Sequence, residues 1–129
     1  MSVQAVAKGV SMSPRKVAVV ADLVRGHSVA DALTILEHTP RRSALPVKKV
    51  IESAQSNADH NHNLRPESLK IVTISVTPGP RTKRYRPAAH GRALPYQKKS
   101  SHITVIVEGE KREVKKVADK KPATKKETK

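Results

Sequence analysis

The most distinctive chemistry of the chain lies in residues 80–102, PRTKRYRPAAHGRALPYQKKSSH, which contain seven Arg or Lys, no Asp or Glu, and both tyrosines. Arginine binds phosphate bidentately, lysine binds it as a point charge, and tyrosine can stack on a base or a sugar. We therefore expect this segment to contact a nucleic acid. The candidate contact residues are Arg81, Lys83, Arg84, Tyr85, Arg86, Arg92, Tyr96, Lys98 and Lys99.

The overall composition points in the same direction. The 129 residues carry a formal net charge of +15 and a sequence pI of about 10.5, which favours a polyanionic partner. An anionic membrane is the competing partner, but no apolar run is long enough to span a bilayer. The N-terminal MSVQAVAKGVSM lacks the charged start and apolar centre of a signal peptide, so we expect a soluble, cytosolic protein.

Composition and spacing also argue against catalysis and metal binding. The chain has no cysteine, which excludes a thiol nucleophile, a disulfide and a thiolate metal site. His60 and His62 have no third ligand nearby in the sequence, and the run Ser100, Ser101 and His102 has no evident acidic partner. We expect no active site, no metal and no cofactor.

Two short helices are predicted near the N-terminus. In SMSPRKVAVVADLVRG, Ser13 suits a cap, Pro14 a first turn, and Gly26 the left-handed position after the last turn. The next helix, VADALTILEH, follows Ser28, which together with Asp31 resembles a capping box. Apolar residues at helical spacing should bury one face of each helix. These residues are Val17, Val20, Ala21 and Val24, and then Val29, Ala32, Leu33 and Leu36.

A third helix is predicted to end at Asn61 or Asn63, either of which can adopt the left-handed conformation. Its start has two alternatives. It could begin at Pro40 and kink at Pro46, or it could begin at Leu45. Its apolar stripe consists of Val47, Val50, Ile51, Ala54 and Ala58.

Alternating apolar residues predict strands in LKIVTISVT (69–77) and HITVIVE (102–108), and VQAVAKGV (3–10) is a third, Val-rich candidate. The predicted fold class is α+β, with three helices packed on a three-stranded antiparallel sheet and a long protruding β-hairpin arm. The residues expected to share a side of their strand are Val72, Ile74 and Val76, and likewise Ile103, Val105 and Val107.

The connection between the two clearest strands, residues 79–101, is longer than most loops. Extended out and back it would reach about 35 Å from the sheet. We therefore interpret residues 78–101 as an arm with its tip near His90 and Gly91. The Lys- and Glu-rich segment 109–129 is expected to be a disordered basic tail, which leaves residues 1–108 as one RNA-binding domain.

Basic residues outside the arm are also candidate RNA contacts, because residues 1–108 hold 17 basic residues against 7 acidic ones. The alternative function is a DNA-binding regulator, since the first two helices, joined by Gly26 and His27, have helix-turn-helix spacing. The second helix argues against it, because it carries Asp31 and Glu37 and no Lys or Arg. The helix-borne candidates are Arg15, Lys16, Arg25, Arg41, Arg42, Lys48 and Lys49.

Three stretches carry a family resemblance: SPRKVAVVADLVRGHSVADALTILEHTPRRSALPVKKVIESAQSNADHN, then VTPGPRTKRYRPAAHGRA, then SSHITVIVEG. In register over about residues 5–108, the chain resembles the twenty-second protein of the bacterial large ribosomal subunit. The resemblance implies a structural protein, cytoplasmic within the ribosome, that binds large-subunit rRNA and supports its assembly. The sequence departs from that family at Ala88, Ala89 and His90, where further basic residues are common, and at LPYQ (94–97).

The resemblance further implies that the hairpin lines the nascent-peptide exit tunnel. The implied partners are large-subunit ribosomal RNA, neighbouring large-subunit ribosomal proteins and the nascent polypeptide. We expect neither a membrane partner nor a homo-oligomer. The residues that would face the tunnel are Pro87, Ala88, Ala89, His90, Gly91 and Arg92.

Overall fold

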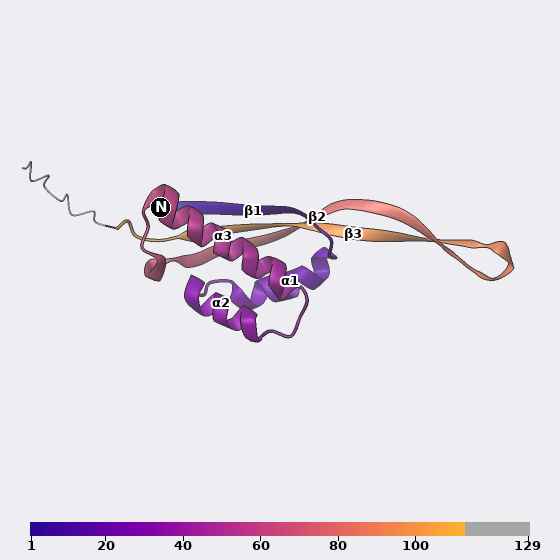
Figure 1. Ribbon diagram of the computed structural model, residues 1–129, viewed down its shortest axis with the longest axis horizontal. Coiled ribbons are helices and arrows are strands. Elements are labelled where there is room, and N and C mark those ends of the chain that lie inside the picture. Colours follow the sequence, from indigo (N-terminus) through magenta and orange to yellow (C-terminus); the bar gives the residue numbers. More distant parts are fainter. Residues whose placement is uncertain (113–129) are drawn as a thin grey trace, which may run out of the picture.

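The computed structural model describes residues 1–112. Three helices cover one face of a three-stranded antiparallel sheet, and two of the strands continue past the helices as a long hairpin (Figure 1). This architecture confirms the predicted α+β fold class. The elements are β1 (Ser2–Val10), α1 (Pro14–Val24), α2 (Val29–His38), α3 (Ala44–His62), η1 (Pro66–Ser68), β2 (Lys70–Pro87), η2 (Ala89–Gly91) and β3 (Ala93–Glu108).

The first two helices begin and end where their cap residues predict. Ser13 is the N-cap of α1, although its side chain makes no cap hydrogen bond, and Gly26 follows the helix with φ of 80°. At α2 the Ser28 hydroxyl accepts a hydrogen bond from the Asp31 amide at 3.2 Å. The predicted apolar faces are buried, except that Leu33 is only half-buried.

Helix α3 begins at Ala44, one residue before the later of the two predicted starts. Pro46 therefore lies in the first turn, where a missing backbone N–H breaks no intrahelical hydrogen bond and no kink is needed. The helix ends at Asn63, which has φ of 49° and ψ of 43° and is one of the two predicted stops. All five residues of the predicted apolar stripe are buried.

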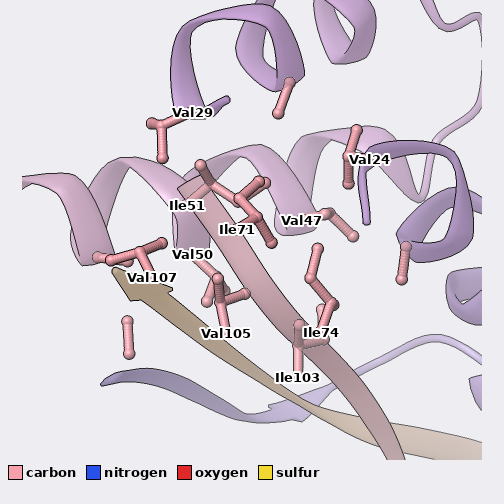
Figure 2. Close-up of a cluster of buried hydrophobic side chains, with 14 of the residues drawn as sticks. Val24, Val29, Val47, Val50, Ile51, Ile71, Ile74, Ile103, Val105 and Val107 are labelled. Carbon is pink, nitrogen blue, oxygen red and sulfur yellow. The ribbon is translucent and has the colours of Figure 1, made fainter. Parts of the chain in front are cut away.

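The core lies between the helices and the inner face of the sheet, whose strand order is β1-β3-β2. Central strand β3 contributes Ile103, Val105 and Val107, all completely buried, as predicted. Figure 2 shows these side chains directed toward Val47, Val50 and Ile51 of α3. The core contains no aromatic ring, because the chain has neither Phe nor Trp and both tyrosines lie in the arm.

The predicted inner face of β2 is wrong at one position. Val72 is 48% exposed, whereas Ile71 and Ile74 are buried and Val76 is half-buried. The pairing with β3 shifts register between Ile71 and Thr73, so a bulge inserts one residue into the strand. An extra residue reverses the alternation of side chains, which is why a simple period-two pattern fails here.

The turn between α1 and α2 is hydrogen-bonded to the outer edge of β2. The Gly26 amide donates to the Ile71 carbonyl at 3.1 Å, and the Ile71 amide donates to the His27 carbonyl at 3.0 Å. The Val29 amide donates to the Leu69 carbonyl at 3.0 Å. Because this turn satisfies the edge of the sheet, its spacing has a structural explanation within the domain.

The arm begins where the core ends, at Ser101, which is fully buried and pairs with the last residue of β1, Val10. Both outer strands have a register shift at this level, between Ala7 and Val10 in β1 and between Pro78 and Arg81 in β2. Bulges of this kind bend a strand and increase its twist. Beyond them only β2 and β3 continue.

The predicted hairpin arm over residues 78–101 is a continuous extension of the two strands. The antiparallel pairing runs without a further shift from Arg81 opposite Lys99 to Pro87 opposite Ala93. The tip is a short turn closed by a 2.8 Å hydrogen bond from the Ala88 amide to the Arg92 carbonyl. His90 and Gly91 have φ of 58° and 67°, which confirms the predicted tip.

Residues 109–112, which sequence analysis assigned to the tail, contact the folded domain. The Arg65 amide donates to the Glu110 carbonyl at 2.9 Å, and the Arg112 amide donates to the Asn63 carbonyl at 2.8 Å. Hydrogen bonds to the domain are therefore also made by residues that follow position 108. From residue 113 onward, the tail that was expected to be disordered lies outside the described residues.

Candidate nucleic-acid interface

The arm has two faces, and each carries basic residues and one tyrosine. Side chains alternate along a strand, and the pairing places Arg84 opposite Tyr96 and Tyr85 opposite Pro95. Neither face offers an apolar surface on which the domain could fold back. One face holds Arg84, Arg86, Tyr96 and Lys98, and the other holds Arg81, Lys83, Tyr85 and Lys99.

The arm is almost entirely open to solvent. Between Arg81 and Lys99 only Ala88 and Tyr96 are half-buried, and every other residue is exposed. Tyr85 is 68% exposed, whereas Tyr96 is covered by Arg86, whose guanidinium carbon lies 4.7 Å from the ring centroid. This cation–π contact places one arginine over an aromatic ring, a combination that also occurs in sites that recognise bases and phosphates.

The tip differs from the shaft in its charge. From Pro87 to Gly91 it contains no Arg or Lys, and His90 is its only titratable side chain. Arg92 lies at the base of the turn, where its backbone closes the tip. The shaft is therefore suited to phosphates, and the tip is suited to a surface that demands little charge.

A cleft of about 750 Å³ lies at the root of the arm, where the domain and the shaft meet. Three segments far apart in the sequence form its walls: residues 11–16, 41–43 and 97–99. Five predicted site residues meet here, and none of the lining side chains, all of which belong to the described part of the chain, is acidic. The basic lining residues are Lys16, Arg41, Arg42, Lys98 and Lys99.

The uncharged residues of this cleft were not among the predicted site residues. Ser11, Met12, Ser13, Ser43 and Gln97 also line it. They lie in three separate segments, and no local pattern marks them as neighbours. Only the packing of the helices against the sheet brings them together, so their spacing in the sequence contains no signal for the site.

Two other predicted site residues already have acidic partners within the domain. Arg25 forms an ion pair with Asp22 at 2.9 Å and also donates to the Ile74 carbonyl at 3.2 Å. Lys48 Nζ lies 2.7 Å from Glu37 Oε1 and 3.8 Å from Glu52 Oε1. A phosphate would have to compete with these partners.

The charges of the second pair affect their proton affinities. The hydrogen bond from Lys48 and its positive charge lower the pKa of Glu37, and the hydrogen bond to Glu37 raises the pKa of Lys48. The remaining helix-borne candidates, Arg15 and Lys49, are exposed and line neither the cleft nor the arm.

Other kinds of site have no counterpart in the described residues. Within residues 1–112 no three His, Asp or Glu side chains are close enough together to hold a metal ion. None of the helices in the same range is sufficiently long and apolar to cross a membrane. What the described surface does present is a basic, two-faced arm and a basic cleft at its root.

The fold and the charge together define a small basic α+β protein with a hairpin arm. The sequence profile of the ribosomal protein L22p/L17e family matches residues 5–108. The chain is also 50% identical over 108 residues to the large ribosomal subunit protein uL22 of Herpetosiphon aurantiacus, an alignment that covers 84% of this chain and 96% of the relative. The chain therefore belongs to the ribosomal protein L22p/L17e family.

Family membership confirms the resemblance found in the sequence and supplies a location. The chain is a ribosomal protein of the large subunit, and the ribosome is cytoplasmic in bacteria. The helix-turn-helix alternative receives no support from the family. In the structure, the turn that suggested it is hydrogen-bonded to β2.

Proposed function

We propose that this protein binds large-subunit rRNA, supports folding of that RNA during subunit assembly, and lines the nascent-peptide exit tunnel with its hairpin tip. The observation that carries the proposal is the arm, in which no residue from 81 to 99 is buried and both faces are basic. An extended hairpin that buries nothing against its own domain gains its packing from a partner. Its charge makes RNA the partner that fits.

The arm is suited to RNA on two sides. Arg84 and Arg86 face one way and Lys83 faces the other, so phosphates on both sides can be neutralised at once. The exposed ring of Tyr85 is available for stacking on a base. The hairpin projects away from the helices, so its shaft can enter a space between RNA helices while the domain stays outside (Figure 1).

The tip has the properties of a tunnel wall. Ala88, Ala89 and Gly91 bring no charge, so a nascent chain of either sign would meet little attraction there. Neighbouring large-subunit proteins and the nascent polypeptide are the protein partners that this placement predicts. We propose that the protein acts structurally, without catalysis, and as a single copy.

The test separates the shaft from the tip. Arg84→Glu with Arg86→Glu places two acidic groups beside phosphates, a loss of several kcal/mol, and should reduce occupancy in purified large subunits. Arg84→Lys with Arg86→Lys keeps the charge and is the matched control. Shortening the segment from Pro87 to Leu94 should leave occupancy intact and change the reactivity of tunnel-wall nucleotides toward a chemical probe. Loss of occupancy on shortening the tip, with none on charge reversal, would show the arm to be anchored by its end.

A further inference from the structure

We propose that the cleft at the root of the arm binds the phosphate backbone of an RNA strand and recognises adjacent phosphates without reading bases. The inference rests on the proposed function, because it takes RNA as the ligand. It goes further by naming one site, its residues and the chemical group it holds. The site lies at the hinge between the domain and the arm.

Five basic side chains surround the cleft. The cleft has a volume of about 750 Å³. Its domain side carries Lys16, Arg41 and Arg42, and its arm side carries Lys98 and Lys99. Within residues 1–112, none of these five side chains forms an ion pair, whereas Arg25, Lys48 and Arg112 all do. Five unneutralised cations around one hollow repel each other, and an anion placed between them relieves the repulsion.

Two helix N-termini lie at the same cleft. The N-caps Ser13 of α1 and Ser43 of α3 both line the cleft. Both helices begin at the end of the domain from which the hairpin projects (Figure 1). Helix N-termini carry partial positive charge that favours phosphate. Pro14 and Pro46 have no N–H and the Ala44 amide already donates to the Arg41 carbonyl at 2.9 Å, so the contribution of these two termini is mainly this charge. Neither first turn contains an acidic residue, whereas the first turn of α2 contains Asp31.

The side chain of Ser43 is available at the same cleft. Ser43 is only 6% exposed and lines the cleft, yet its side chain makes no cap hydrogen bond. The hydroxyl of Ser28, at the start of α2, does make one. Among the described residues Ser101 Oγ is the only enclosed side-chain oxygen without a partner, so the Ser43 hydroxyl is open to the cleft. A phosphate oxygen entering the cleft would accept a hydrogen bond from this hydroxyl.

The lining residues also indicate what the cleft does not read. It contains no aromatic ring to stack on a base and no Asn, Asp or Glu among its described side chains. Gln97 is the only amide there. Specific recognition of single-stranded bases relies on stacking and on such polar groups, so the cleft is suited to phosphates and to the shape of the backbone. A volume within the usual 300–1,000 Å³ of ligand sites admits more than one phosphate.

The experiment uses the full chain and a single-stranded oligouridylate as the probe. Arg41→Gln with Arg42→Gln removes two charges from the domain wall, and Lys98→Gln with Lys99→Gln removes two from the arm wall. The matched control is Arg65→Gln with Lys70→Gln. It removes two exposed charges just before and at the start of β2, at the end of that strand away from the arm. NMR amide shifts and the salt dependence of affinity are measured for each protein.

On titration the largest amide shifts are expected at Ser13 and Ser43, the N-cap residues of α1 and α3 that line the cleft. Each cleft variant should reduce the slope of log affinity against log salt by about 1.4, the value for two phosphate contacts to a single strand. The control should retain the wild-type shifts at these amides. It should reduce the salt slope by less than either cleft variant does. An oligocytidylate should give the same shifts.

Two different failures can be told apart. If the wild type binds with a steep salt slope but both cleft variants behave like the control, the cleft inference is overturned and the proposed function stands. A strong preference for one base would likewise overturn recognition through phosphates. If the wild type itself shows a salt slope near zero toward structured large-subunit RNA, the proposed function fails and the cleft inference fails with it.

Discussion

Strands β2 and β3 each contain two regions with the same backbone pairing and opposite side-chain chemistry. On the helix side of Ser101, β3 buries Ile103, Val105 and Val107 against the helices. Beyond Ser101, the same strand exposes Gln97, Lys98 and Lys99. One region is stable because it packs on the domain. The other has only its hydrogen bonds and cross-strand pairs until a partner covers it.

This difference shows that a β ladder does not by itself make a stable structure. Isolated two-stranded hairpins are marginally stable in water, and three strands or a covering layer are usually needed. The domain provides both, whereas the arm has neither. A protein built this way keeps a rigid base and an arm that the proposed RNA partner would complete.

The largest expected contrast is in hydrogen exchange of the free protein. Amides of Ile103 and Val105 should exchange only on global unfolding, with an opening free energy of about 5 kcal/mol or more. Amides from Arg81 to Arg86 should open at a free energy near zero. Exchange followed by NMR measures both. Equal protection along the whole of β2 and β3 would show the arm to be stable without RNA.

The second contrast uses apolar residues of the same strand. Ile103→Ala should lower the free energy of unfolding by about 2–5 kcal/mol, because it leaves a cavity in a fully buried site. Leu94→Ala, at a position that is 58% exposed, is the control and should change it by less than about 0.5 kcal/mol. Urea denaturation gives both values, and similar losses would mean that the arm has a core of its own.

The third contrast concerns the junction between domain and arm at Gly79 and Ser100. It tests whether this junction unfolds together with the domain or with the arm. A Cβ atom on Gly79 would lie 2.7 Å from the Ser100 hydroxyl, which donates a 2.6 Å hydrogen bond to the Pro80 carbonyl. Gly79→Ala should displace that hydroxyl and reduce the free energy of unfolding by about 1 kcal/mol. With Ser100→Ala already present, the same substitution should have less effect. No change in global unfolding for either variant would place the junction with the arm.

The smallest effect concerns pH and the domain surface. Lys48 lowers the pKa of Glu37, so the pair stabilises the fold above the unfolded-state pKa of Glu37 and loses this contribution as pH falls through the lowered folded-state pKa. The raised pKa of Lys48 has the opposite sign, and its contribution is lost as pH rises through that folded-state value.

Glu37→Gln tests this pair. The control is Glu67→Gln, because Glu67 is exposed and forms no ion pair among the described residues. The difference in unfolding free energy between wild type and Glu37→Gln should be constant near neutral pH and shrink in acid. A difference that stays constant through acid pH would contradict the assigned pKa shift.

Much of the fold could be predicted because its signals are local. Ser28 with Asp31 fixes the start of α2, and Asn63 ends α3 in the left-handed conformation. The tip at His90 and Gly91 follows from the same backbone chemistry. The long hairpin arm was predicted from the length and charge of its segment, because period-two patterning depends on one buried face and the arm has none.

The candidate site could be predicted only in part. The charged residues of the arm are visible as a run, but Arg25 and Lys48 look the same in the sequence as Arg41 and Arg42. Ion pairs with Asp22, Glu37 and Glu52 are what separate them. A partner eleven residues away, as Glu37 is from Lys48, is chosen by how two helices pack.

By itself, the sequence determined the chemistry of each segment: which helix faces are apolar, where the helices stop, and that one long segment is basic without a single acidic residue. These properties depend on residues a few positions apart. The tertiary structure alone decided that Val72 points outward, because the bulge beside it depends on pairing with β3. It alone also gathered residues 11–16, 41–43 and 97–99 around one cleft, because helix packing and strand register join positions that no local interaction connects.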